Sequence, residues 1–342
     1  MTVTSKSVAD ADKDRLQTGA GSALTQVWRD YKVILVLFVL MLAVTSVLAP
    51  VFFNPGNLIN VARQASLTGV VAVGMTFVVL TAGIDLSVGS ILALVGIIFS
   101  ITVNAGLGVP AALVLALLVG TAMGLANGIG VTFLGIQPFI MTLAAMAVAS
   151  GFALLISNGT PIHFASDSAV IDLLGNGNLF GVPGPAIIFA IVAIVAALVL
   201  HYLPFGRFVY GIGGGLEAAR LSGVRTARVL IIVYAISGFC AAIAGIITTS
   251  RLFVGHPTAG APIMLDSIAA VVIGGTSLMG GKGSIIGTVA GVLLLAMVSN
   301  LLNLLGVSPF NQQIAKGAII ILAVLFTAQG LRPRIVQQWN AL

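Results

Sequence analysis

The sequence predicts an all-α, polytopic membrane protein of about ten transmembrane helices. Of its 342 residues, 59% are hydrophobic and only 7% are charged, whereas soluble domains carry roughly a quarter charged residues. Glycine is frequent, with 41 residues, and aromatic residues are scarce, which suits closely packed membrane helices better than a membrane β-barrel. Apolar runs of about 20 residues, the length of a membrane helix, recur along the chain.

Ten apolar segments fit a membrane span, and polar ends flank them. Residues 1–32 are expected to form a flexible cytoplasmic tail, 33–330 one transmembrane domain and 331–342 a cytoplasmic C-terminal tail. Merging the short gaps at 83–85 or 281–283 into re-entrant segments would change the count. The expected spans are roughly 33–50, 64–82, 86–104, 109–133, 138–156, 186–203, 229–250, 263–280, 284–306 and 313–330.

Basic residues give the orientation, because lysine and arginine favour short cytoplasmic segments. The 157–184 segment contains neither, and it carries Asp167 and Asp172. A ten-span count therefore places both termini and the 204–228 segment in the cytoplasm. The basic residues on this side are Lys6, Lys13, Arg15, Arg29, Lys32, Arg207, Arg220, Arg225, Arg228, Lys282, Arg332 and Arg334.

The same count divides the spans into two sets of five that start from opposite sides, as in an inverted repeat. "GIDLSVGSIL" and "GGKGSIIGTV" each place a charge in a Gly-rich gap between spans. These gaps are not strictly equivalent, so the sequence allows, but does not require, an inverted repeat of two halves.

The longest expected cytoplasmic loop, 204–228, contains the chain's only glutamate, Glu217. "LEAARLS" predicts a short helix, because Gly213 to Gly215 interrupt the chain before it and Gly223 can end it. Such a helix, with part of its surface made of small residues, could dock into a groove on another protein. The alternative is an ordinary amphipathic loop helix.

Three long stretches resemble the membrane permeases of ribose-type sugar ABC importers, a family related to branched-chain amino acid permeases. They are "GMTFVVLTAGIDLSVGSILAL", "FGRFVYGIGGGLEAARLSGV" and "LDSIAAVVIGGTSLMGGKGSIIGT". They occur in the order typical of the family, and the resemblance covers about residues 33–330.

The resemblance implies a ten-span permease that pairs with a second permease copy, as a homodimer or a heterodimer, in the bacterial cytoplasmic (inner) membrane. A cytoplasmic ABC ATPase would hold the ATP and Mg²⁺, and a periplasmic or extracellular binding protein would deliver the sugar. Residues 33–330 would be the permease domain, with 204–228 as the loop that couples it to the ATPase.

One departure from the family pattern lies in this coupling loop. The family usually has Gly-Gly-Asn followed by one or two acids, whereas Leu216 follows Gly214 and Gly215 here. This difference alters the fine contacts with the ATPase, not the role of the loop. The coupling residues that the resemblance implies are Gly206, Arg207, Gly213, Gly214, Glu217, Ala218, Ala219, Arg220 and Gly223.

No catalytic, cofactor or metal site is expected within the chain. "GGTSLMGGKGS" fails the phosphate-loop spacing, because Gly283 rather than Ser or Thr follows Lys282. ATP binding is therefore expected on a partner chain. His163, His201 and His256 are far apart in sequence, which argues against a shared metal site. The net charge of +6 reflects the segments that flank the spans, not nucleic-acid binding.

"TAGIDLSVGS" places a lone carboxylate, Asp85, between two long apolar runs. The expected topology puts it in the cytoplasmic turn before the third span, where aspartate can cap a helix. The alternative role is a hinge or gate on the inner side of the pathway. The pathway candidates are Asp85, Ser87, Gly89, Asn127, Gln137 and Asp266.

Three cations, Arg63, Arg251 and Lys316, are expected near the outer ends of spans. They could receive acidic side chains of the binding protein, because charge complementarity favours correct docking. The alternative is anchoring to lipid headgroups. Asp266, near the outer start of the eighth span, could line the access path or pair with Arg251.

The predicted function is the permease subunit of an ATP-driven importer for a sugar or sugar-like solute. The alternative is a secondary transporter that uses an ion gradient, which requires a buried carboxylate or ion site near the middle of the membrane. The expected positions of Asp85 and Asp266, near the ends of spans, disfavour this alternative.

Overall fold

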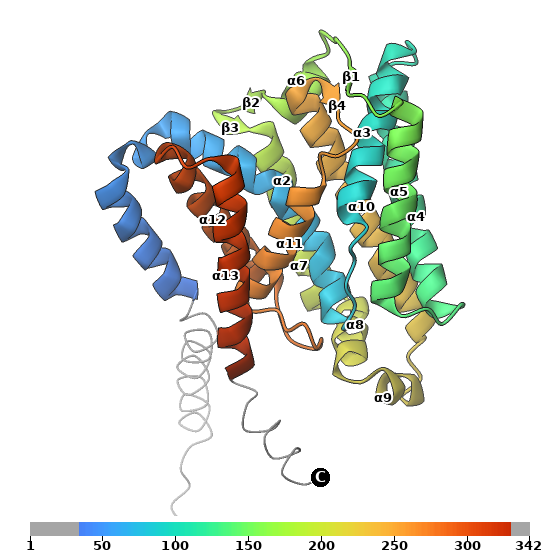
Figure 1. Ribbon diagram of the computed structural model, residues 1–342. Helices are drawn as coiled ribbons and strands as arrows, with labels where there is room; N and C mark the ends of the chain where they lie inside the picture. Colours follow the sequence, from blue (N-terminus) through green and yellow to red (C-terminus); the bar gives the residue numbers. More distant parts are fainter. Residues whose placement is uncertain (1–33, 330–342) are drawn as a thin grey trace, which may run out of the picture.

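Two long helices, α2 (Pro55–Leu80) and α10 (Thr226–Leu252), form the centre of the bundle in the computed structural model, which describes residues 34–329 (Figure 1). Asn54 caps the start of α2, because its side-chain oxygen accepts the backbone N–H of Gly56 at 2.9 Å. Every α2 residue from Gly69 to Leu80 is buried. This half of α2 is therefore a core helix and not a lipid-facing one.

The remaining elements surround this central pair. They are the helices Ile34–Leu48, η1 (Pro50–Phe53), α3 (Val88–Asn104), α4 (Val109–Thr132), α5 (Pro138–Ser157), α6 (Ala169–Gly175), α7 (Gly184–Tyr202), α8 (Pro204–Gly214), α9 (Leu216–Leu221), α11 (Ala261–Ile273), α12 (Ile285–Leu304) and α13 (Pro309–Gln329). Four short strands complete the described part: β1 (Ile162–His163) pairs antiparallel with β4 (Val254–Gly255), and β2 (Asn178–Leu179) with β3 (Val182–Pro183).

The two ends of the bundle differ in structure. The strands and α6 lie at one end, and α8 and α9 lie at the opposite end (Figure 1). The described chain begins and ends, near residues 34 and 329, toward the end that carries α8 and α9.

Small residues let α4 and α10 pack backbone to backbone. Gly120, Gly124 and Gly128 recur every four residues on α4 and face α10. A Cβ at Gly124 would overlap the carbonyl oxygen of Tyr234, and a Cβ at Gly128 would lie 2.6 Å from the Cα of Ile231. This spacing is the small-xxx-small pattern of membrane helix pairs, in which van der Waals contact replaces the hydrophobic effect.

Two non-helical segments interrupt the bundle, 81–87 after α2 and 274–284 after α11. The end of α2 is a Schellman motif, in which the backbone N–H of Gly83 bonds to Val78 at 3.0 Å and that of Ala82 to Val79 at 2.9 Å. Irregular backbone at membrane depth is tolerated where protein buries it.

The expectation of an all-helical, polytopic membrane protein is confirmed. Within residues 34–329, six helices are long and apolar enough to cross a membrane, namely α2, α4, α5, α7, α10 and α12. The eighth span was expected to reach residue 280, but α11 ends at Ile273, because Gly274 and Gly275 follow it. The expected tails, 1–32 and 331–342, lie outside the described residues.

Residues 204–228 were expected to form a loop with one short helix, and this is wrong for the first half of the segment. Residues Pro204–Gly214 form α8, so Gly213 and Gly214 continue a helix and only Gly215 interrupts the chain. The second half is as expected: α9 covers Leu216–Leu221, and Gly223 follows it with a left-handed φ of 83°.

Candidate functional site

The carboxylate of Asp85 is fully buried, and together with Ser87 it joins the 81–87 segment to two helices, α10 and α4. Its Oδ1 accepts the backbone N–H of Ser87 at 3.0 Å and the Ser87 hydroxyl at 2.6 Å. Its Oδ2 accepts the hydroxyl of Ser237, on α10, at 2.8 Å. Asn127, on α4, donates to the Ser87 hydroxyl at 2.8 Å. The structure therefore brings together three of the expected pathway residues, Asp85, Ser87 and Asn127.

Asp85 lies, as expected, in the turn between two long helices, α2 and α3, and its side chain is completely buried. The capping expectation is right only in part. Ser87, not Asp85, is the N-cap residue of α3, although the carboxylate does accept the Ser87 backbone N–H.

Two buried polar atoms beside this network, the Tyr234 hydroxyl and Asn127 Oδ1, have no hydrogen-bond partner among residues 34–329. A Cβ at Gly83 would lie 2.7 Å from the Tyr234 hydroxyl, so this hydroxyl abuts the 81–87 segment. An unpaired buried polar atom is costly. The polar contacts around this segment are therefore incompletely satisfied in the present conformation.

A cavity of about 310 Å³ opens between α3, α5 and the start of α11. Within the described residues, the Ser90 and Ser150 hydroxyls on its wall have no hydrogen bond. The backbones of Gly89 and Gly260 meet beside it, since a Cβ at Gly89 would lie 2.6 Å from the Gly260 carbonyl oxygen. The lining residues are Gly89, Ser90, Ala93, Met146, Ala147, Ser150, Pro257, Thr258, Gly260, Ala261 and Met264.

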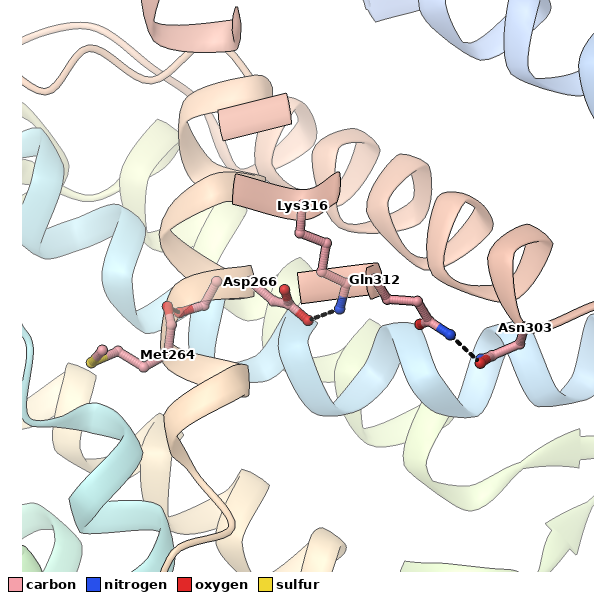
Figure 2. A network of polar contacts seen from close by, with 6 residues as sticks. Met264, Asp266, Asn303, Gln312 and Lys316 are labelled. Atoms are coloured by element: carbon pink, nitrogen blue, oxygen red, sulfur yellow. Dashed lines mark hydrogen bonds and ion pairs between the residues drawn. The ribbon is translucent and has the colours of Figure 1, made fainter. Parts of the chain in front are cut away.

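Asp266 on α11 forms an ion pair with Lys316 on α13, with 2.7 Å between Oδ2 and Nζ (Figure 2). Of the alternatives for Asp266, a structural ion pair is confirmed, but its partner is Lys316 and not Arg251. Gln312, one turn before Lys316, donates to Asn303 of α12 at 2.7 Å (Figure 2). Two polar contacts thus tie α13 to the neighbouring helices, and Lys316 is engaged within the bundle.

Arg63 and Arg251 lie close to the same residue, Asn176, which directly follows α6. Arg63 donates to the Asn176 carbonyl at 2.7 Å and to Asn178 Oδ1 at 3.0 Å. The Asn176 side chain donates to the Arg251 carbonyl at 3.0 Å. The buried Nε of Arg63 has no hydrogen-bond partner in the part of the chain that the structure describes. The structure therefore groups two of the three expected outer cations around Asn176, whereas Lys316 pairs with Asp266.

The expected coupling residues of the α8–α9 segment differ in how exposed they are. Gly206 and Ala219 are buried, whereas Arg207, Gly214, Ala218 and Gly223 are exposed. The exposed side chains of Glu217 and Arg220 lie 3.8 Å apart, a weak surface pair. Leu216 and Leu221 are 48% and 87% exposed, so α9 carries apolar side chains that no described residue covers.

Gln137 is not part of the Asp85 network. It is the exposed N-cap residue of α5, and its side chain makes no capping bond. Sequence reasoning missed Ser237 and Tyr234, which lie in the apolar run of α10, and missed Ser90, Ser150 and Thr258. For Ser237 and Tyr234, the only signal in the sequence was the alternation of small and polar residues in "YAISGFC".

Among the described residues, no group of three or more His, Cys, Asp or Glu could hold a metal ion. His163 lies in β1, and His256 directly follows β4, the strand that pairs with β1. The His256 ring nitrogen Nδ1 lies 3.1 Å from the Thr258 hydroxyl.

Comparison with known proteins gives one family and several close relatives. The family described as "Branched-chain amino acid transport system / permease component" matches residues 57–324. The ribose import permease protein RbsC of Haemophilus influenzae is 43% identical over 292 residues, which cover 85% of this chain and 90% of the relative. The RbsC protein of Bacillus subtilis is 44% identical over 289 residues, 84% of this chain and 89% of the relative.

A further relative carries a different name. The L-arabinose transport system permease protein AraH of Escherichia coli is 37% identical over 309 residues, 88% of this chain and 91% of the relative. No solved structure matches the chain.

Proposed function

Because the chain belongs to the family of branched-chain amino acid transport system permease components, and within it to the carbohydrate ABC permeases, we propose that it carries ribose or a closely similar pentose into a bacterial cell. It is the permease component of a ribose-type ABC importer, a multi-pass membrane protein and not an enzyme. The observation that carries the proposal is 43–44% identity to ribose import permeases along nearly the full length of both chains.

We propose a topology of ten spans with both termini in the cytoplasm, built as two inverted halves. Five helices precede the 158–183 segment, Ile34–Leu48 and α2 to α5, and five apolar helices follow it, α7 and α10 to α13. The basic residues Arg207, Arg225 and Arg228 lie in or beside α8 and α9, which supports a cytoplasmic position for that end.

We propose that two copies of the chain form the passage between them and alternate between outward-open and inward-open states. The cavity between α3, α5 and α11 supports a sugar path along this face. Its unbonded Ser90 and Ser150 hydroxyls can hydrogen-bond a sugar, and its methionine and alanine side chains suit the apolar face of a sugar ring. Gly89 lines this cavity, and the Asp85 network lies directly before it in the chain.

The outer partner is a sugar-binding protein, and the inner partner is an ABC ATPase that holds ATP and Mg²⁺. We propose that Arg63 and Arg251 receive acidic side chains of the binding protein, since both lie by Asn176 at the end opposite α9. We propose that α9 is the coupling helix that enters a cleft of the ATPase. Its exposed leucines support docking over an ordinary loop helix.

Leu221→Asp should lower the amount of ATPase that co-purifies with the permease by about tenfold or more, since it places a charge in the apolar contact. Phe180→Asp is the matched control, because Phe180 is 97% exposed at the opposite end of the bundle. Co-purification with a tagged ATPase, compared at equal permease amounts, measures the effect. Equal loss in both variants, or no loss at Leu221, would argue against α9 as the docking helix.

A further inference from the structure

Three backbone segments meet without side chains between them at the end of the bundle that carries α8. A Cβ at Gly213, in α8, would overlap the carbonyl oxygen of Leu80 and the backbone nitrogen of Gly281. The N–H of Gly281 donates to the same Leu80 carbonyl at 2.9 Å. α8, the last residue of α2 and the 274–284 segment are therefore in direct backbone contact.

Neighbouring residues extend this contact on both sides. A Cβ at Gly280 would lie 2.8 Å from the backbone nitrogen of Ala82 and 3.0 Å from the Cα of Gly213. The Tyr210 hydroxyl, one turn before Gly213 in α8, donates to the Gly283 carbonyl at 2.9 Å. We call Gly213, Gly280, Gly281 and the Leu80–Ala82 backbone the glycine joint.

Ala82 within the joint adopts a conformation that L-residues rarely use. Its φ is 61°, at the C′ position of the Schellman motif, where glycine is usual. A non-glycine residue held there stores strain, of the kind found in switch segments. Three residues further on is Asp85, whose carboxylate holds Ser237 of α10.

These contacts form one continuous path from the exposed helix α9 to the interior. Gly215 alone separates α9 from α8, α8 meets the joint at Gly213, and the joint leads through Ala82 to the Asp85 network. Backbone contact leaves no flexible side chain to absorb a displacement, and packed interiors transmit strain.

We propose that the glycine joint transmits the movement of the ATPase from α9 to the 81–87 segment, and so makes Gly213 a positioning residue for transport. This inference rests on the proposed function. A substitution that opens the joint should leave the ATPase able to hydrolyse ATP but should separate hydrolysis from sugar movement.

Gly213→Ala tests this in vesicles that contain the permease, its ATPase and the binding protein. The readout is the number of ribose molecules taken up per ATP hydrolysed. We expect this ratio to fall about fivefold to tenfold, while ATP hydrolysis stays within about twofold of wild type. The intrinsic helix propensity of alanine exceeds that of glycine, so a loss cannot come from a weakened helix.

Gly211→Ala is the matched control, since Gly211 lies in the same helix and a Cβ there meets nothing within 4 Å. It should keep the wild-type ratio. Tyr210→Phe is the second test variant, because it removes the hydrogen bond to Gly283 and adds no atoms. It should lower the ratio about twofold to threefold even if Gly213→Ala fails to assemble.

A wild-type ratio in Gly213→Ala would overturn the proposal, as would a wild-type ratio in Tyr210→Phe when Gly213→Ala does not assemble. An equal loss in Gly211→Ala would overturn it too, because the effect would then belong to α8 in general. Failure of the wild-type vesicles to take up any sugar would instead contradict the proposed function, which separates the two results.

Discussion

Gly124→Val is expected to remove most of the folded protein from the membrane fraction. The helices α4 and α10 touch through their backbones at this position, where any Cβ would overlap the Tyr234 carbonyl oxygen and approach the Cα of Gly238 at 3.1 Å. Valine would therefore separate the helices along their whole contact. Overpacking typically costs about 1–3 kcal/mol and occasionally more, and contact with backbone that cannot move aside places this site at the upper end, a large share of a typical stability of about 5–15 kcal/mol.

Gly151→Val is the control for this prediction. Gly151 lies on the exposed face of α5, and a Cβ there meets nothing within 4 Å. The two substitutions are chemically identical and both lie in long apolar helices. Size-exclusion chromatography of the detergent-solubilised protein should show a sharp monodisperse peak for Gly151→Val and aggregated or missing material for Gly124→Val. Similar profiles for the two variants would contradict backbone contact between α4 and α10.

Asp85→Ala should destabilise the protein by about 3 kcal/mol and lower the amount of assembled, transport-competent permease. The substitution leaves three buried donors without an acceptor, the Ser87 backbone N–H and the hydroxyls of Ser87 and Ser237. Each unsatisfied buried group costs about 1–3 kcal/mol, reduced where the hydroxyls find other partners. Thermal unfolding in detergent measures the loss. Asp167→Ala, at an exposed position in the 158–183 segment, should leave the Tm unchanged.

Asp85→Asn separates a structural role from a gating role. The amide oxygen can still accept from Ser87, and the amide nitrogen can donate to the Ser237 hydroxyl, which accepts as well as donates. We expect normal assembly and a Tm close to wild type, with most of the transport retained. Loss of transport in a normally assembled protein would contradict the structural role and assign Asp85 to a gate.

Hydropathy located the helices well, because burial in lipid requires long apolar segments whatever their neighbours are. It failed where packing overrides local preference. Gly213 and Gly214 predict a break, yet α8 continues through Gly214 because Gly213 packs against the backbone of Leu80. α11 ends early because Gly275 takes a left-handed φ of 86° and closes a Schellman motif, in which the Thr276 N–H bonds to the Val271 carbonyl at 3.1 Å.

The polar pairings were beyond the reach of one sequence, because they join residues distant along the chain. Asp266 has Arg251 only 15 residues before it and Lys316 50 residues after it, yet it pairs with Lys316 (Figure 2). Ser237 lies 152 residues from Asp85 in an otherwise apolar helix. Only the arrangement of the helices brings these groups together.

Uptake of radiolabelled ribose into vesicles tests the central claim most directly. The vesicles would contain the wild-type chain, with the ATPase, ATP and the binding protein added singly and together. We predict accumulation of ribose only when all three are present, and none under a proton or sodium gradient alone. Accumulation by the chain without ATP and without its partners would contradict the importer function and would favour an ion-coupled transporter.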